Sequence, residues 1–238
     1  MSTIPPDAHL MIIGAMKAGT SALFSLLAQH PMIAPCCMKE PEYFSERQIH
    51  GIKNKKMAYA SLWDFDPTQH RYALEASTGY SKFPREQNVP ANIAAAGLQP
   101  VFIYLVRDPV ARAFSQYCFA HAVGKVNPDL PVTDNQYVDF SRYHTQLQHY
   151  RQYFPAQSFV LVDFDELARS PQALLQGLCQ RLQLPAIVFD LDRMDRHATP
   201  ASGLLLADTD RQIIHKMLES DMQAFARDYD FPVQKWGF

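Results

Sequence analysis

Residues 11–23 read Met-Ile-Ile-Gly-Ala-Met-Lys-Ala-Gly-Thr-Ser-Ala-Leu, and this segment is more informative than the rest of the chain. Its apolar beginning predicts a β-strand that ends at Gly14, and the pair Thr20-Ser21 predicts the start of an α-helix after a glycine-bearing turn. Such a turn directs several backbone N–H groups at one point, where the positive end of the helix dipole adds to their field. The stretch therefore predicts a binding site for a phosphate-like anion.

The turn has the glycine spacing of a P-loop but not its lysine position. Gly14 and Gly19 are separated by four residues, as in a P-loop. A nucleoside-triphosphate P-loop continues with Lys, which reaches the β- and γ-phosphates, and then with Ser or Thr, which binds magnesium. Here Thr20 occupies the lysine position, and the only lysine of the turn is Lys17. We therefore expect the turn to bind a doubly substituted anion through one cationic contact, without a metal ion.

The composition is that of an ordinary globular protein. The 238 residues are 47% hydrophobic and 19% charged, with a net charge of −2. This length predicts one large domain, residues 1–238, and the charge argues against a general nucleic-acid binder. The four cysteines contain no C-x-x-C pair and predict neither a zinc site nor a disulfide framework. The sequence begins without a signal-peptide pattern and has no apolar run of the ~20 residues that a membrane span needs, so we expect a cytoplasmic protein.

Apolar runs of strand length alternate with helical patterns along the chain. The expected strands cover residues 10–13, 72–74, 101–106 and 159–162, and the expected helices cover 20–29, 92–96, 109–122, 143–153, 171–182 and a long segment from 208 or 209 onward. Residues 125–134 and 194–208 are expected to be loops. This alternation predicts an α/β fold with a central parallel sheet flanked by helices. The glycine spacing of the turn 14–21 makes it a P-loop-like nucleotide-binding fold.

Two candidate anion-binding elements follow predicted strands. The turn 14–21 follows the first strand, and Arg107 follows the apolar run 101–106, just before Asp108 and Pro109 begin a helix. Ligands of open α/β sheets bind outside the carboxyl ends of the strands. We therefore expect the two elements, which are distant in sequence, to share one edge of the sheet.

At this point the chain resembles the sulfotransferases that use 3′-phosphoadenosine 5′-phosphosulfate (PAPS). Residues 14–21, Gly-Ala-Met-Lys-Ala-Gly-Thr-Ser, are similar to the 5′-phosphosulfate loop of that family. Residues 105–115, Leu-Val-Arg-Asp-Pro-Val-Ala-Arg-Ala-Phe-Ser, are similar to its 3′-phosphate motif. Residues 39–44 (Lys-Glu-Pro-Glu-Tyr-Phe), 75–80 and 159–184 resemble the branch that contains glycosaminoglycan and many bacterial sulfotransferases, and the resemblance spans most of the chain.

The resemblance implies roles for particular residues. Lys17 would contact the bridging oxygen and the sulfuryl group, and Glu40 would be the general base. The residues implied to bind the donor nucleotide are Lys17, Ala18, Gly19, Thr20 and Ser21 at the 5′ end, with Arg107 and Ser115 at the 3′-phosphate and Arg196 as a further candidate.

The chain also departs from the family pattern. Ala76 stands where several glycosaminoglycan enzymes carry Lys, and the histidine that the cytosolic aryl and steroid enzymes use as base has no counterpart near Ser77. The Arg-Lys-Gly-rich third motif of those cytosolic enzymes is not visible, and Arg193 and Arg196 lie in about its region.

Alternatives stay open for several of these roles. Glu42 is the nearest rival base, and His121 is a second one. Glu75 either orients the acceptor or forms a structural ion pair, and Arg107 could instead pair with a structural acid. The lysines at 53, 55 and 56 could attract an anionic acceptor or be a solvated loop.

The sequence thus predicts an enzyme that moves a sulfuryl group from PAPS to an acceptor hydroxyl, with an amine as second choice. One alternative is a P-loop kinase that uses ATP and magnesium, against which Thr20 argues. Another is a non-catalytic relative that binds the nucleotide without turnover. No acceptor signature is visible, so carbohydrates, glycolipids, peptide natural products and small phenols or alcohols are all candidate acceptors.

Overall fold

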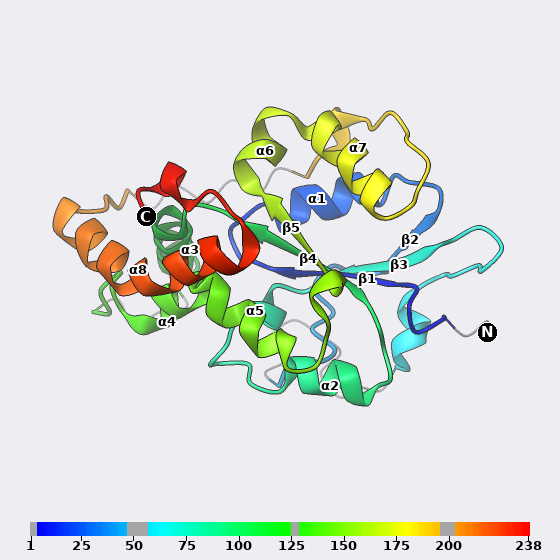
Figure 1. The fold of residues 1–238 in the computed structure, drawn as a ribbon, viewed down its shortest axis with the longest axis horizontal. Helices are drawn as coiled ribbons and strands as arrows, with labels where there is room; N and C mark the ends of the chain where they lie inside the picture. The colour runs from blue at the N-terminus through cyan, green and yellow to red at the C-terminus, as the bar shows by residue number, and fades with distance from the viewer. Residues whose placement is uncertain (1–3, 47–56, 125–128, 196–202) are drawn as a thin grey trace.

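The computed structural model describes residues 4–46, 57–124, 129–195 and 203–238. Five parallel strands form one central sheet in the order β2-β3-β1-β4-β5 (Figure 1). The strands are β1 His9–Gly14, β2 Ile33–Pro35, β3 Tyr72–Ala76, β4 Val101–Val106 and β5 Phe159–Asp163. The predicted α/β fold with a central parallel sheet is confirmed.

Helices cover both faces of this sheet. Figure 1 shows α1, α6 and α7 on one side of the strands and α2 and α5 on the other, with α3, α4 and α8 grouped together beyond α5. The helices are α1 Thr20–Leu27, α2 Val89–Ala95, α3 Pro109–Ala122, α4 Asn135–Val138, α5 Tyr143–Arg151, α6 Phe164–Arg169, α7 Pro171–Arg181 and α8 Asp208–Tyr229.

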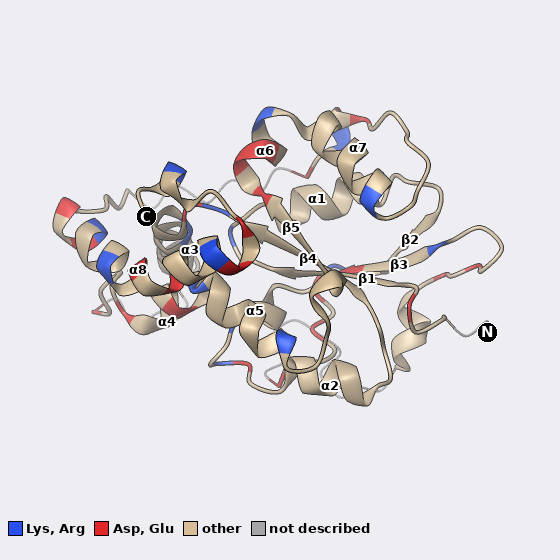
Figure 2. Cartoon of the chain, in the orientation of Figure 1, with Lys and Arg blue, Asp and Glu red and all other residues tan. Residues whose placement is uncertain are grey.

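The two central strands form the core of the molecule. All six residues of β1 are buried, and β4 is buried from Phe102 onward. In β1, Leu10 pairs with Leu74 of β3 on one side and with Val101 of β4 on the other. Figure 2 shows how little charge the strands carry compared with the helices and loops around them. Such continuous apolar runs are typical of parallel strands that helices cover on both faces.

The structure confirms all four predicted strands and moves several boundaries. The strand at 101–106 and the helix at 109–122 have the predicted bounds, because an apolar run leads directly into an Asp-Pro cap. The helix predicted at 92–96 begins earlier, at Val89, where Pro90 fits the first turn. The loops predicted at 125–134 and 194–208 lie partly outside the described residues.

Three of the helices and strands were not predicted: β2, α4 and α6. β2 has only three residues, at the edge of the sheet, and its partner β3 lies some 40 residues later. α6 follows β5 directly, because the Asp163 carboxylate accepts a hydrogen bond of 3.0 Å from the Asp165 N–H and caps a short helix there. This helix brings Phe164 next to the turn after β1.

Candidate functional site

The glycine-bearing turn lies between β1 and α1, as predicted. At Gly14 the backbone φ is +146°, and a Cβ atom there would lie 2.0 Å from the hydroxyl oxygen of Ser81. Only glycine fits such a position without moving its neighbours. Gly19 precedes α1 in the left-handed conformation, with φ +88°. The chain therefore turns sharply from strand to helix at the carboxyl edge of the sheet.

The amino end of α1 offers unused donors. No side chain caps this helix, and the N–H groups of Gly19, Thr20 and Ser21 form no hydrogen bond within the described part of the chain. The Ala18 N–H instead donates to the Ala15 carbonyl at 3.1 Å. Of the three predicted backbone donors, the N–H groups of Gly19 and Thr20 are thus open to an anion, together with that of Ser21, and the role of Ala18 stays a prediction.

Lys17 projects from the middle of this turn. Its φ is +70°, in the left-handed region, and its Nζ lies 4.6 Å from the centre of the Phe119 ring on α3. Burial lowers the pKa of Lys17, the nearby charge of Arg107 lowers it further, and Cys118 acts in the opposite direction. No Asp or Glu side chain of the described residues lies within 4.0 Å of its ammonium group.

Arg107 links the second motif to the first. Its Nη1 donates a hydrogen bond of 3.1 Å to the carbonyl of Lys17, and its guanidinium lies 4.8 Å from the centre of the Phe164 ring. The hydroxyl of Tyr143 on α5 donates to the Arg107 carbonyl at 2.7 Å. Within the described residues Arg107 forms no ion pair, so the alternative of a structural acid partner finds no support there.

The remaining predicted nucleotide contacts are less defined. Ser115 lies on α3, the helix that the Asp108 carboxylate caps by accepting from the N–H groups of Val110 and Ala111. Ser115 is half-buried and takes part in interactions of its own. Arg196 lies outside the described residues, as do the lysines at 53, 55 and 56.

Glu40 lies at the carboxyl end of β3. Its N–H donates to the Ala76 carbonyl at 2.8 Å, and its carboxylate receives hydrogen bonds from Lys39 Nζ at 2.8 Å and Thr78 Oγ1 at 3.3 Å. The side chain is 24% exposed. Burial opposes its ionisation, but Lys39, Lys82 and Thr78 outweigh this effect and set the pKa of Glu40 below its ordinary value. Glu40 is therefore a reachable carboxylate in its basic form.

Glu42 has a different environment, although it is only two residues away. The residue is buried, and its carboxylate accepts from the Gly79 N–H at 2.7 Å and from the Ser45 hydroxyl. Burial raises the pKa of Glu42, against the effect of these hydrogen bonds. The carboxylate is enclosed by protein, which favours Glu40 as the base.

Glu75 is part of the interior rather than of an open site. It is fully buried and accepts hydrogen bonds from the hydroxyls of Tyr59 at 2.9 Å and Tyr80 at 3.5 Å. Burial raises the pKa of Glu75 to about 8. Neither alternative from the sequence fits, because the carboxyl group cannot touch an acceptor and forms no ion pair within the described residues. Tyr59 and Tyr80 lie 16 and 5 residues from Glu75, and no periodic pattern in the sequence pairs either tyrosine with it.

His121, the second rival base, packs against a neighbour on its own helix. Its ring centre lies 4.3 Å from that of Tyr117, and no hydrogen bond or ring contact joins it to Lys17 or Glu40.

Sequence reasoning assigned no role to Arg112, although it stands inside the second motif. The signal for Arg112 was a charged residue within an apolar helix, whose burial the pattern alone does not show.

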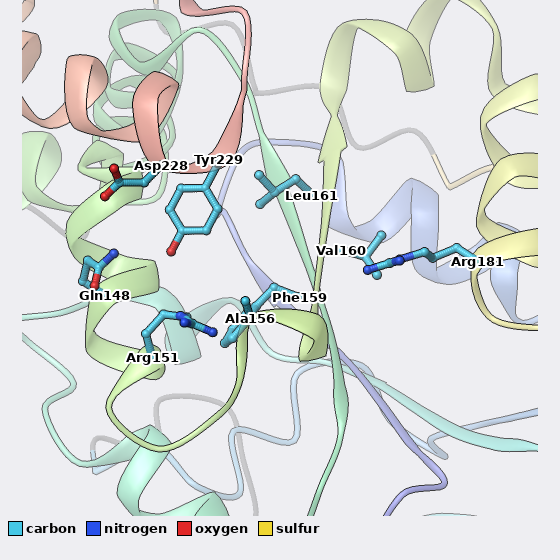
Figure 3. A pocket seen from close by; sticks show the side chains of 9 residues that line it. All are labelled: Gln148, Arg151, Ala156, Phe159, Val160, Leu161, Arg181, Asp228 and Tyr229. Carbon is cyan, nitrogen blue, oxygen red and sulfur yellow. The ribbon is translucent and has the colours of Figure 1, made fainter.

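A separate cavity of about 550 Å³ lies at the free edge of β5 (Figure 3). Figure 3 shows Phe159, Val160 and Leu161 of this strand between side chains of α5 and α8 on one side and Arg181 on the other. These residues belong to the amino-terminal part of β5, whereas the turn after β1 and Arg107 follow carboxyl ends. The cavity is therefore distinct from the candidate site.

Within the described ranges, no three or more His, Cys, Asp or Glu side chains are grouped so as to hold a metal ion. Among the helices of those same ranges, none combines the length and the apolar character that crossing a membrane requires.

Comparison with known proteins agrees with this geometry. The family described as "Sulfotransferase domain" matches residues 7–201. The chain is 27% identical over 208 residues to the bifunctional heparan sulfate N-deacetylase/N-sulfotransferase 1 of Caenorhabditis briggsae, covering 78% of this chain and 23% of that protein. It is 26% identical over 198 residues to the human heparan sulfate glucosamine 3-O-sulfotransferase 3B1, covering 76% and 47%. The chain thus spans less than half the length of these relatives.

A solved structure has the same fold over nearly the whole chain. The sulfotransferase from Alicyclobacillus acidocaldarius superposes with a TM-score of 0.76 at 22% identity, covering 96% of this chain and 98% of that one.

Proposed function

Because the chain belongs to the sulfotransferase domain family, we propose that it transfers a sulfuryl group from PAPS to an acceptor hydroxyl, with an amine as second choice. One observation carries this proposal. Lys17 and Arg107 approach each other at the amino end of a helix with free N–H groups, and neither has an acidic partner within the described residues. Two such cations favour a ligand that carries more than one anionic group.

The chain's residues fit the donor at both of its charged ends. The N–H groups of Gly19, Thr20 and Ser21, together with the hydroxyls of the last two, would hold the 5′-phosphate. Arg107 has the planar fork that suits phosphate oxygens and would bind the 3′-phosphate with Ser115. Arg196 remains a candidate for a further contact there.

Lys17 and Glu40 would act on the reacting groups. PAPS, when bound, supplies a sulfuryl group on a phosphate leaving group. Lys17 would stabilise the negative charge that grows on the leaving oxygen as the sulfur–oxygen bond breaks. Glu40 would accept the acceptor's hydroxyl proton while the new sulfur–oxygen bond forms, and its lowered pKa keeps it ionised for this task.

A carbohydrate is the acceptor class that the relatives favour, since both named proteins are heparan sulfate enzymes. We therefore propose a carbohydrate hydroxyl as the first acceptor to test, ahead of peptide natural products and small alcohols. The kinase alternative has no support in the family match, which is to a sulfotransferase domain. Thr20, in the position of the P-loop lysine, also argues against it. The cytoplasmic location and the absence of a metal requirement stay predictions.

The test is transfer from sulfur-35-labelled PAPS to a panel of sulfated and unsulfated oligosaccharides, phenols and peptides, with EDTA present. We expect labelled product from at least one acceptor and formation of adenosine 3′,5′-bisphosphate (PAP) in equal amount. Tight PAP binding with no transfer to any class would instead support the non-catalytic alternative. ATP consumption that requires magnesium would support the kinase.

A further inference from the structure

Arg112 is a fully buried cation on α3, five residues after Arg107. Its side chain is 0% exposed and is among the largest that the fold encloses completely. Nε donates to the Ser141 hydroxyl at 2.5 Å, and Nη1 donates to Gln116 Oε1 at 2.7 Å and to the Met16 carbonyl at 3.3 Å. Nη2 donates to the Tyr137 carbonyl. Each of these acceptors is uncharged.

The guanidinium therefore has no counter-charge among the described side chains that contact it. No Asp or Glu side chain among the residues described lies within 4.0 Å of it. Burial and the repulsion of Arg107 lower the pKa of Arg112. Tyr143 and Tyr104 would attract the guanidinium only if ionised, and burial raises the pKa of both hydroxyls. Arginine keeps its proton even when buried, so the charge persists. A buried, unpaired charge is unfavourable unless a ligand balances it.

The position of Arg112, beside the turn after β1, indicates which ligand could balance its charge. Its Nη1 holds the Met16 carbonyl, and Arg107 Nη1 holds the next carbonyl, that of Lys17, at 3.1 Å. Two guanidiniums of the second motif thus hold consecutive carbonyls of the anion-binding turn. Because C=O and N–H of a trans peptide point in opposite directions, the bond to Met16 directs the Lys17 N–H away from Arg112. It also supports the left-handed conformation of Lys17, which is otherwise strained.

We propose that Arg112 is a positioning residue for Lys17 and that the phosphate groups of the bound nucleotide balance its buried charge. This inference rests on the proposed function, since it takes the nucleotide to be bisanionic. Arg112 does not touch the reacting atoms. Its hydrogen bond to the Met16 carbonyl holds the turn in place. Its positive charge raises the affinity of the site for the donor and for PAP.

Three variants separate charge from packing. Arg112→Gln removes the charge and keeps hydrogen-bonding groups, whereas Arg112→Lys keeps the charge and loses the planar fork. Arg211→Gln removes one charge from an exposed position on α8 and is the matched control. Calorimetry with PAP gives the dissociation constant for each, thermal unfolding without nucleotide verifies folding, and transfer assays separate kcat from KM.

We expect Arg112→Gln to weaken PAP binding at least about tenfold, while Arg112→Lys and Arg211→Gln stay within about threefold of the parent. We expect kcat to fall in both Arg112 variants, because both lose the fork that holds the turn. Equal PAP affinity in parent and Arg112→Gln overturns the inference, and so does equal weakening in both Arg112 variants. If Arg112→Gln does not fold, a folded Arg112→Lys with a more than tenfold loss of affinity overturns it. A parent protein that does not bind PAP at all refutes the proposed function itself.

Discussion

The Nη1 atom of Arg107 donates a hydrogen bond of 3.1 Å to the carbonyl oxygen of Lys17, which lies 90 residues earlier in the chain. This bond joins the two anion-binding motifs directly, between the carboxyl ends of neighbouring strands β1 and β4. If the proposed roles of these residues hold, the fold thereby sets the distance between the groups that bind the two charged ends of the nucleotide. Such preorganisation is what transfer reactions that depend on positioning and charge stabilisation require.

Lys17→Ala should reduce turnover far more than nucleotide binding. The lysine is assigned to the charge that grows on the leaving oxygen, and removing one such contact costs about a hundredfold to a thousandfold in kcat. PAP affinity, measured by calorimetry, should change only a few-fold. Lys216→Ala, at an exposed position on α8, is the control. A kcat for Lys17→Ala within threefold of the parent would remove Lys17 from the mechanism.

Glu40→Gln and Glu42→Gln should have opposite phenotypes. Glu40→Gln should keep PAP affinity and thermal stability and lose about a hundredfold or more in kcat, because it lacks the proton acceptor. Glu42→Gln should mainly lower the free energy of unfolding, by about 1–3 kcal/mol, since its carboxylate accepts the buried Gly79 N–H and Ser45 hydroxyl. A stable Glu42→Gln protein that binds PAP and has lost transfer would show that the base is misassigned.

Gly79→Ala should disturb the segment that carries Glu40. A Cβ atom on Gly79 would lie 2.0 Å from Glu42 Oε2 and 2.7 Å from its Cδ. Because that carboxylate is enclosed, we expect a loss of about 1–3 kcal/mol in denaturant unfolding, together with lower kcat. Gly177→Ala on α7 is the matched control, since nothing lies within 4 Å of its added methyl group. For Gly177→Ala we expect no loss of stability, and a gain of up to about 1 kcal/mol in the free energy of unfolding. Equal stability of the two variants would contradict the proposed clash.

Glu75 should make the stability of the protein depend on pH. Its pKa is about 8 in the folded state, because it is buried, and 4.5 ordinarily. Between these values the folded state binds more protons than the unfolded state, so the free energy of unfolding falls as pH rises from about 4.5 to about 8. Glu75→Gln lacks this contribution. We expect the stability of the parent relative to Glu75→Gln to decline across that range in denaturant titrations, and parallel pH profiles would refute it.

The sequence predicts those features whose interacting residues are close together in the chain, and it misses those whose partners are distant. The strand 101–106 and the helix 109–122 were predicted to the residue, since an apolar run and an Asp-Pro cap are local signals. β2 was missed because three residues at the edge of a sheet carry no periodicity. Glu40 and Glu42 could not be separated, because the Gly79 N–H that binds Glu42 comes from 37 residues away.

The burial of Arg112 is the clearest limit of the sequence. Its place in an apolar helix suggested nothing about acceptors at Met16, Tyr137 and Ser141, which three other segments bring to it. The anion-binding turn, in contrast, was recognisable from its own glycines and lysine. The turn from strand to helix is thus predicted from local signals, whereas the distant residues that hold it in place are not.

Calorimetric titration with PAP in the presence of EDTA, beside titration with ATP and magnesium, shows whether the turn after β1 and Arg107 together bind a bis-anionic nucleotide. We expect one PAP site per chain without magnesium, at least about tenfold weaker binding of ATP with magnesium, and loss of PAP binding in Arg107→Ala. Absence of heat with PAP, together with tight binding of ATP and magnesium, would contradict it.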